Sequence, residues 1–219
     1  MTDNGQQGNL CQSAMMLPFS TVLLMLLLVS NTPARADMYK DCGPGVDPDL
    51  QIRACSQVIK RGKKKTLNIG GAHFIRGTAH LLKGQHGRAI ADYNKSIAVE
   101  PQHFKAHMNR GVSYLLTGEY GRASADFTQS IKLKPNSYIG YANRAWNYFK
   151  WGKPELGLPD ANRALKLKPD SGDGFEARGH IYEALGQKQK AIADLREAVK
   201  LDPSLKKAVA ALRRLVAEP

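Results

Sequence analysis

The residues of this chain whose types and spacing could do chemistry are four arginines and four aspartates. Each arginine is followed by an aspartate 16 residues later, and the pair recurs every 34 residues. The pairs are Arg76 with Asp92, Arg110 with Asp126, Arg144 with Asp160 and Arg178 with Asp194. An active site would need one such constellation rather than four copies. We therefore predict that each arginine pairs with an aspartate of its own or a neighbouring repeat and so orients the helices.

Other reactive arrangements are not found in the sequence. His103 and His107 are four residues apart, but a predicted helix start separates them, and no cysteine or acidic cluster lies at ligand spacing. The sequence also contains no nucleophile elbow, phosphate-binding loop or paired-carboxylate arrangement. We predict no catalytic residue, no metal site and no cofactor, and we interpret the chain as a protein that is not an enzyme.

The elements that must position the arginines and aspartates follow the same 34-residue interval. Prolines at this spacing divide the chain into four frames, which end shortly after Pro101, Pro135, Pro169 and Pro203. Rings recur at the fourth offset (His73, His107, Tyr141, Phe175) and the eleventh (His80, Tyr114, Tyr148, Tyr182), small residues at the eighth (Gly77, Gly111, Ala145, Gly179) and glycine at the fifteenth (Gly84, Gly118, Gly152, Gly186). Such self-similarity is typical of stacked repeats.

The pattern resembles the tetratricopeptide repeat (TPR) family, whose unit is a pair of antiparallel helices. The resemblance covers about 136 of the 219 residues. It implies an all-α fold, namely a right-handed α-solenoid of helix-turn-helix repeats with a C-terminal capping helix. We assign the repeats to 70–103, 104–137, 138–171 and 172–205, and the capping helix to 206–219. The last segment is amphipathic and basic, which leaves binding to a membrane surface open as an alternative to capping.

Local features of the repeats predict how the paired helices meet. The small residues at the eighth and twentieth offsets let the two helices approach closely, and the glycine at the fifteenth ends the first helix in a left-handed conformation. The third repeat is irregular, because Gly157 replaces the usual alanine and Pro159 lies inside the second helix. We expect this helix to be kinked or shortened.

The N-terminal segment predicts export. Residues 15–29 form a compact apolar run that is too short for a confident membrane span, and Ala34-Arg35-Ala36 has the small-x-small form of a signal-peptidase site. We assign residues 1–36 to a signal peptide that is cleaved after Ala36, which indicates a periplasmic or secreted protein of the exported bacterial TPR type. No Lys or Arg precedes the run, so an uncleaved anchor stays open as an alternative.

Residues 37–69 are interpreted as a degenerate half-repeat held by a disulfide. Extending the TPR frame upstream to 36–69 places Cys42 seventh and Cys55 twentieth, near the contact between the two helices of a repeat. An even cysteine count in an exported chain also favours a disulfide between Cys42 and Cys55. Two free thiols are the alternative. The cations that follow, in the segment 60–65, form either an anion-binding patch or a solvated connector.

The resemblance also implies where a ligand would bind. In TPR proteins the first helix of each pair lines a concave groove, and its groove positions correspond here to Phe74, Thr78, Met108, Asn109, Val112, Asn143, Trp146, Phe149, Lys150 and His180. The alternative is that several of these residues pack between helices. The ninth offset holds Thr78, Val112, Trp146 and His180, none of which is the asparagine of the lysine–asparagine clamp that grips a C-terminal carboxylate.

The charge adds a second functional hypothesis. The formal net charge is +13, and such a surplus attracts acidic partners. The favoured interpretation is a non-enzymatic scaffold of the cell envelope that binds a protein or peptide, with acidic partners preferred, in the TPR groove. The alternative is a basic surface that binds an anionic envelope polymer or a membrane surface. Nucleic acid is disfavoured as a partner, and membrane contact is left open.

Overall fold

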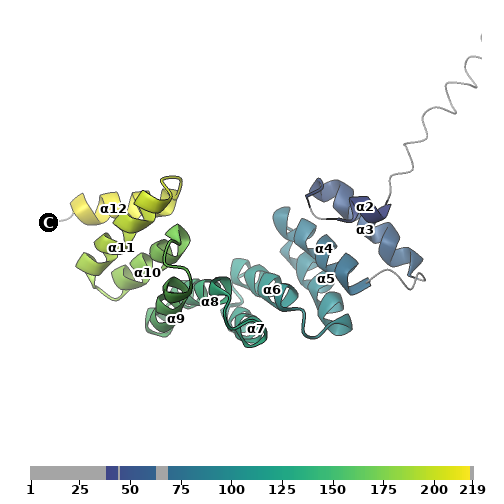
Figure 1. Cartoon of the computed structure of the whole chain (residues 1–219), viewed down its shortest axis with the longest axis horizontal. Coiled ribbons are helices and arrows are strands. Elements are labelled where there is room, and N and C mark those ends of the chain that lie inside the picture. Colours follow the sequence, from purple (N-terminus) through teal and green to yellow (C-terminus); the bar gives the residue numbers. More distant parts are fainter. Residues whose placement is uncertain (1–37, 44, 63–68, 218–219) are drawn as a thin grey trace, which may run out of the picture. The chain divides into compact units, whose positions relative to one another are not determined.

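The computed structural model describes residues 38–43, 45–62 and 69–217, which form helices joined by short loops and no strand (Figure 1). The predicted signal peptide and residues 63–65 of the basic run lie outside the described residues. Within the described ranges, no helix is long and apolar enough to cross a membrane. The helices are α2 (Met38–Asp41), α3 (Pro48–Arg61), α4 (Ile69–Leu82), α5 (His86–Val99), α6 (Phe104–Leu116), α7 (Tyr120–Leu133), α8 (Tyr138–Lys150), α9 (Pro154–Leu167), α10 (Gly172–Ala184), α11 (Lys188–Leu201) and α12 (Lys206–Ala217).

The helices form four pairs, each of which packs on the next. We call α4, α6, α8 and α10 the first helices, and α5, α7, α9 and α11 the second helices. Neighbouring first helices contact one another, and α10 also contacts α12, whereas each second helix contacts only the helices directly before and after it in the chain. The first helices and α12 therefore form an inner face and the second helices an outer face, as the TPR resemblance implies.

Glycines end the first helices as predicted. The glycine that follows each first helix has a positive φ: 68° at Gly84, 78° at Gly118, 72° at Gly152 and 70° at Gly186. The amide of the next residue then bonds a carbonyl of the preceding helix, as Gln85 N–H does to His80 O at 2.9 Å. A side chain would strain this conformation, which explains the glycine in every repeat.

The close approach between paired helices is confirmed, but its main partner lies elsewhere than expected. A Cβ added to Gly77 would lie 3.0 Å from the Tyr93 ring, and one added to Gly111 would lie 2.8 Å from the Phe127 ring. The eighth offset therefore packs on the twenty-fourth, where a large ring fills the space that the glycine leaves. Both rings are fully buried.

The third repeat solves the same contact differently. A Cβ on Gly157 would lie 2.8 Å from the carbonyl oxygen of Ala145 and 3.2 Å from Cδ1 of Ile181. Glycine at this position therefore lets α9 approach the backbone of α8 and leaves room for Ile181 of the next repeat. Ala145, Ala161 and Ile181 form one buried cluster.

Pro159 does not shorten α9, so this prediction was wrong. Helix α9 has 14 residues, the same length as α5, α7 and α11, and it continues through Pro159. The ring is exposed, and the flanking residues Asp160, Ala161 and Ala164 are buried against the neighbouring helices. Packing of this buried side stabilises the helix in spite of the hydrogen bond that proline cannot donate.

The N-terminal element has the predicted disulfide but a different register. Cys42 and Cys55 are bonded, with their Cα atoms 4.8 Å apart. Helix α3 begins at Pro48, 38 residues before the start of α5 at His86, whereas the second helices begin 34 residues apart. Cys55 therefore takes the place that Tyr93 has in the next repeat, and the frame 36–69 was wrong by four residues. The connection between α3 and α4 is longer than the others, so the 34-residue interval does not extend through it.

Helix α12 covers the end of the stack. Its residues Ala208, Ala211 and Leu215 are buried in one cluster with Ala191 and Leu195 of α11. Glu176 of α10 accepts a hydrogen bond from the backbone N–H of Ala208 at 2.9 Å and so satisfies one free donor near the start of α12. The contacts are those of a capping helix, and α12 occupies the position of a fifth first helix.

Candidate functional site

The arginines and aspartates that opened the sequence analysis form four equivalent ion pairs. In every repeat the arginine donates from Nε and Nη2 to the two carboxylate oxygens of the aspartate in the same repeat, over distances of 2.6–2.9 Å. The aspartates are buried and the arginines about four-fifths buried. Two-point pairing of this kind fixes both distance and orientation, so it sets the angle between the paired helices. The predicted structural role is confirmed.

The remaining guanidinium nitrogen links each repeat to the one before it. Nη1 of Arg110, Arg144 and Arg178 donates to a polar side chain 16 residues earlier in the chain, at 2.6–2.9 Å. Nη1 of Arg76 donates to Ser56 of α3, 20 residues earlier, at 2.8 Å. The four additional residues match the longer connection between α3 and α4. The arginines therefore join the repeats to one another as well as the two helices within each repeat.

Electrostatics in these pairs favours the charged forms. Burial alone would raise the pKa of the Asp92 and Asp126 carboxyl groups, but the hydrogen bonds from Arg76 and Arg110, with contributions from His73 and His107, lower both below 3.8. The bond to Asp126 conversely raises the pKa of Arg110. Both partners are fully ionised at neutral pH, so neither acts as a proton donor or acceptor there.

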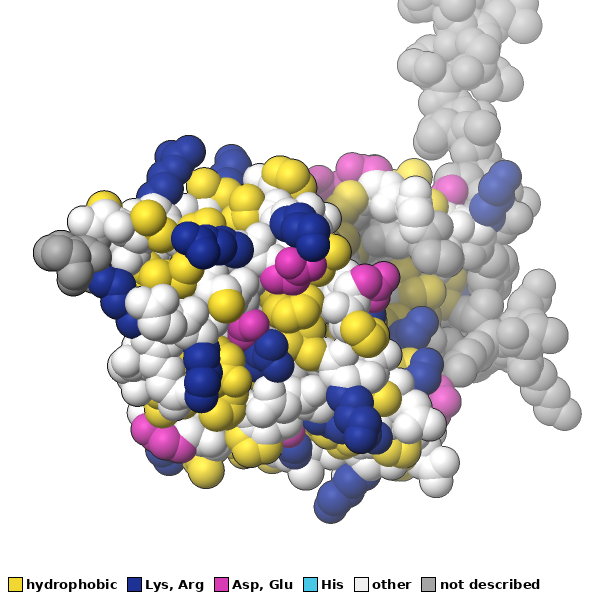
Figure 2. All heavy atoms as spheres, turned by 60° about the vertical axis from the view of Figure 1, so that its left-hand side comes forward, with side chains coloured by type: hydrophobic (Ala, Val, Ile, Leu, Met, Phe, Trp, Pro, Cys, Tyr) yellow, Lys and Arg dark blue, Asp and Glu magenta, His cyan; other side chains and the backbone are white. Residues whose placement is uncertain are grey.

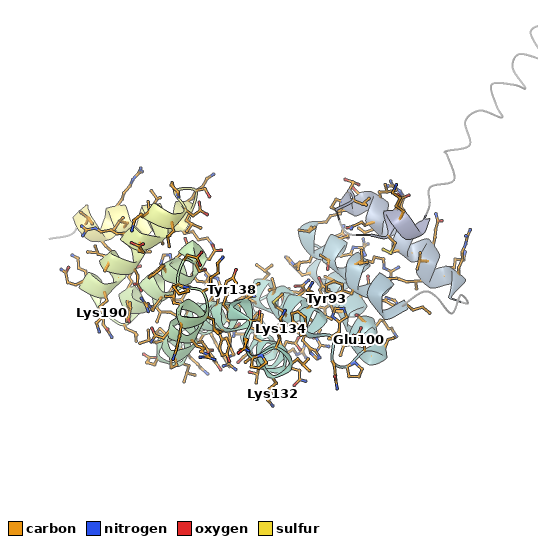
Figure 3. All side chains as sticks on the ribbon, viewed as in Figure 1. Tyr93, Glu100, Lys132, Lys134, Tyr138 and Lys190 are labelled. Atoms are coloured by element: carbon orange, nitrogen blue, oxygen red, sulfur yellow. A yellow bond between two sulfur atoms is a disulfide. The ribbon has the colours of Figure 1, made fainter. Side chains whose placement is uncertain are left out.

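The inner face of the first two repeats carries a compact polar and aromatic cluster. The Phe74 ring lies 4.6 Å from His103 and 6.1 Å from Tyr93, measured between ring centroids. The hydroxyl of Tyr93 donates to Thr78 Oγ1 at 3.3 Å, and Asn109 Nδ2 donates to the same oxygen at 3.4 Å. Burial raises the pKa of Tyr93 to about 12. Figure 3 labels Tyr93 within this part of the stack. The structure thus brings Phe74, Thr78 and Asn109 together as a link between repeats.

A second cluster forms the inner face of α8, α10 and α12. The Trp146 ring lies 5.1 Å from Phe149 and 5.7 Å from His180, and Phe149 stacks on His180 at 5.6 Å. Lys207 of α12 places its Nζ 5.2 Å above the Trp146 ring. His180 Nδ1 lies 3.4 Å from Glu183, and its Nε2 is buried and has no hydrogen-bond partner in the described part of the chain. We call Trp146, Phe149, His180 and Lys207 the aromatic cluster.

The other predicted groove residues do not join either cluster through a specific side-chain bond. Met108, Val112 and Asn143 are half-buried on α6 and α8, and Lys150 is exposed at the end of α8. Lys207 and His103 were missed by the sequence analysis. Lys207 occupies the second offset of the frame that would follow residue 205, so counting beyond the last proline would have found it. His103 lies in the loop before α6, outside the helix that the groove rule considers.

Within the described ranges, no three His, Cys, Asp or Glu side chains are grouped so that they could hold a metal ion. The inner face offers hydrogen-bonding groups, aromatic rings and cations. These groups can bind a peptide by contact and by charge.

Comparisons with known proteins agree with this geometry. Residues 76–138 and 175–205 match family models described as tetratricopeptide repeat. No curated protein matches the sequence. Among solved structures, the first TPR of Spaghetti (RPAP3) bound to the HSP90 peptide SRMEEVD is 25% identical, with a TM-score of 0.50, over 52% of this chain and 91% of that one.

Two further structures extend the similarity in fold. TTC0263, a thermophilic TPR protein from Thermus thermophilus, matches with a TM-score of 0.62 and 14% identity over 90% of this chain and 96% of its own. MamA from Desulfovibrio magneticus RS-1, residues 41 to the end, matches with a TM-score of 0.60 and 21% identity over 67% of this chain and 82% of its own.

Proposed function

Because this chain is a tetratricopeptide repeat protein, we propose that it is a non-enzymatic scaffold of the cell envelope that binds a protein or peptide segment on its inner face. The coarser role, a protein-interaction scaffold, is supported by the repeats and by the peptide bound to the Spaghetti TPR domain. The envelope setting is supported by the apolar run at 15–29 with its cleavage motif and by the bond between Cys42 and Cys55. Disulfides persist in oxidising compartments such as the periplasm.

The aromatic cluster is the observation that carries the binding proposal. Two rings, an imidazole and a lysine from three helices converge on one stretch of the inner face. Tryptophan is among the residue types that contribute most to binding energy, and the rings offer apolar area to a bound side chain. The unpartnered Nε2 of His180 can bond a peptide carbonyl or hydroxyl. Lys207 and Lys150 favour an acidic neighbour in the bound segment.

Site-specific photocrosslinking in living cells tests this proposal. A photoreactive amino acid at Lys150, exposed at the inner end of α8, should capture a partner, whereas the same group at Leu156, which is 54% exposed on α9, should not. Adding Trp146→Ala to the Lys150 probe should abolish most of the adduct, because the substitution removes the largest apolar surface of the cluster.

Two controls keep the result interpretable. Circular dichroism and thermal unfolding of the Trp146→Ala variant must show that the repeats stay folded, and Leu156→Ala should leave the Lys150 adduct unchanged. Equal capture at Lys150 and Leu156, or an adduct insensitive to Trp146→Ala in a folded protein, would contradict inner-face binding.

The export part of the proposal is tested separately. Cells that express the full chain should contain a mature form in the envelope or secreted fraction, and N-terminal sequencing of it should begin at Asp37. A full-length chain confined to the cytoplasmic fraction would rule out export.

A further inference from the structure

The charge of the repeats is segregated between the two faces. The second helices contain ten Lys and Arg and six Asp and Glu, and four of those acids are the aspartates neutralised by arginines of the first helices. With these four ion pairs set aside, the second helices keep ten basic and two acidic side chains, and the first helices keep two basic and three acidic ones. The surplus that gives the repeats their positive charge therefore lies on the outer face.

Each second helix presents at least one exposed cation with no ion-pair partner among the described residues. These are Lys95 of α5, Lys132 of α7, Lys166 of α9 and Arg196 of α11. They lie on the side of their helices that faces away from the buried aspartates. Figure 3 labels Lys132 on α7 and Lys190 on α11, both on second helices, and Figure 2 shows more Lys and Arg than Asp and Glu on the side that carries α11 and α12. Unpaired cations are available to bind anions without first breaking an internal pair.

We infer that the outer face binds a flexible linear phosphate polymer that lacks bases, independently of the segment bound on the inner face. Each repeat contributes cations at the 34-residue interval, so a chain of regularly spaced phosphates can contact one helix after another. Lys and Arg both bind phosphate oxygens through charge-assisted hydrogen bonds.

A membrane surface fits this face less well than a polymer does. Second helices do not contact one another, unlike the first helices, so they are further apart and need a ligand that can follow from helix to helix. Between the cations the exposed residues are small, such as Gly87, Ala91, Gly121, Ala125 and Ala193. Interfacial helices instead expose a stripe of bulky apolar side chains.

The bulky apolar side chains that are exposed on the described second helices are few. They are Val99, Leu156 and Leu201, each in the first or last turn of its helix.

A nucleic acid is also disfavoured by the residues of the outer face. Proteins that bind single strands stack the bases on exposed aromatic rings. In the second helices Tyr93 and Phe127 are fully buried, Tyr120 is half-buried, and no aromatic residue is exposed. The outer face therefore offers contacts for phosphates but none for bases.

The test compares two variants of the full chain that lose the same charge at different places. The outer variant carries Lys95→Gln, Lys132→Gln, Lys166→Gln and Arg196→Gln. The matched control carries Lys40→Gln, Lys105→Gln, Lys206→Gln and Arg213→Gln, four cations that are likewise exposed and without an ion-pair partner in the described ranges but lie on α2, α6 and α12. Unfolding temperatures close to that of the wild type verify that both variants fold.

Binding is measured with end-labelled long-chain inorganic polyphosphate over a series of salt concentrations. The outer variant should lose at least about tenfold in affinity, and the slope of log K against log salt should become shallower by about 3, which is roughly 0.7 for each lost contact. The control should stay within about twofold of the wild type.

Three results would overturn the inference. Equal losses in both variants would reduce the effect to net charge. Absence of wild-type binding even at low salt would remove the site. Tighter binding of oligothymidylate or of phosphatidylglycerol vesicles than of polyphosphate would assign the outer face to another class of ligand. None of these results bears on the Lys150 crosslinking experiment, so the two proposals fail separately.

Discussion

Asp126 is a buried carboxylate that joins several parts of the fold. Its two oxygens accept hydrogen bonds from Nε and Nη2 of Arg110 at 2.8 and 2.6 Å, and His107 Nδ1 lies 3.3 Å away. Nη1 of the same arginine reaches Asn94 of the preceding repeat. Removing the charge of Asp126 would leave a partly buried guanidinium without its counter-charge, which is costly because the site holds little water.

Acid should weaken this pair, and Asp126→Asn should remove the effect. The folded-state pKa of Asp126 lies below 3.8, so the unfolded chain binds the proton more readily. The stabilisation is therefore complete above pH 3.8 and is lost as the pH falls through that value toward the folded pKa. Urea unfolding at pH 7 should show a loss of about 2–4 kcal/mol for Asp126→Asn.

The difference between wild type and Asp126→Asn should narrow when the same titration is repeated near pH 3. A difference that is the same at both pH values would show that the substitution acts through packing rather than through charge. Arg122→Gln, which removes an exposed pair with Glu119, is the control and should cost less than about 1 kcal/mol at pH 7.

Two glycines of the second repeat should respond oppositely to alanine. Gly111→Ala would place a Cβ 2.8 Å from the buried Phe127 ring, so it should destabilise the fold by about 1–3 kcal/mol. Gly121 lies exposed in α7, and its added Cβ would meet only Trp151 at 3.7 Å. Gly121→Ala should stabilise the helix by about 0.5–1 kcal/mol. Thermal unfolding measures both, and effects of the same sign would contradict the packing argument.

At the scale of elements, α9 is the second helix that contains an internal proline. It keeps 14 residues because its buried side, with Gly157, Asp160 and Ala161, packs against α8 and α10. The sequence rule that proline breaks a helix weighs only local terms, namely one missing N–H and a clash with the preceding turn. In a packed helix pair, burial outweighs these terms, and this is why the local rule failed here.

Pro159→Ala should therefore stabilise the protein. Alanine restores a backbone donor and has a far higher helix propensity, so the free energy of unfolding should rise by about 1–3 kcal/mol. Pro135→Ala is the control: this proline is exposed in the loop between α7 and α8, and its replacement should cost up to about 1 kcal/mol through the greater freedom of the unfolded chain. A loss of stability on Pro159→Ala, seen by urea titration, would show that the third repeat depends on the proline.

At the scale of the whole described stack, each helix pair depends mainly on its neighbours. The N-terminal end is held by the bond between Cys42 and Cys55, which encloses a sequence separation of 13 residues. In the chain-entropy model such a link contributes about 3 kcal/mol. The C-terminal end is covered by α12 instead, through burial of Ala208, Ala211 and Leu215. One end of the array is thus stabilised covalently and the other by packing.

Reduction should consequently loosen only the N-terminal end. Hydrogen exchange followed by mass spectrometry should show faster exchange in α2 and α3 after addition of reductant, a smaller change in α4, and none in α8 to α11. A Cys42→Ser/Cys55→Ser variant should behave like the reduced protein and should not respond to reductant. Faster exchange throughout the chain would mean that the array unfolds as one cooperative unit.

The sequence by itself determined the repeat unit, because each 34-residue interval repeats the residues that its own helix pair needs. Gly84 and its equivalents require a positive φ, and the eighth-offset glycines require a close neighbour, so both were readable without coordinates. The Arg76–Asp92 pair and its copies were predictable for the same reason. Local requirements of this kind leave the same residue at the same offset every time.

Only the tertiary structure decided what depends on contacts between repeats. It showed that α3 is displaced by four residues, that α9 tolerates Pro159 and that Lys207 reaches Trp146 of α8. It also assigned the surplus of positive charge to the second helices, since the sequence counts charges but does not say which of them are neutralised. Each of these features is set by the energy of packing or pairing between elements distant in the chain, and such energies are fixed only once the elements have been brought together.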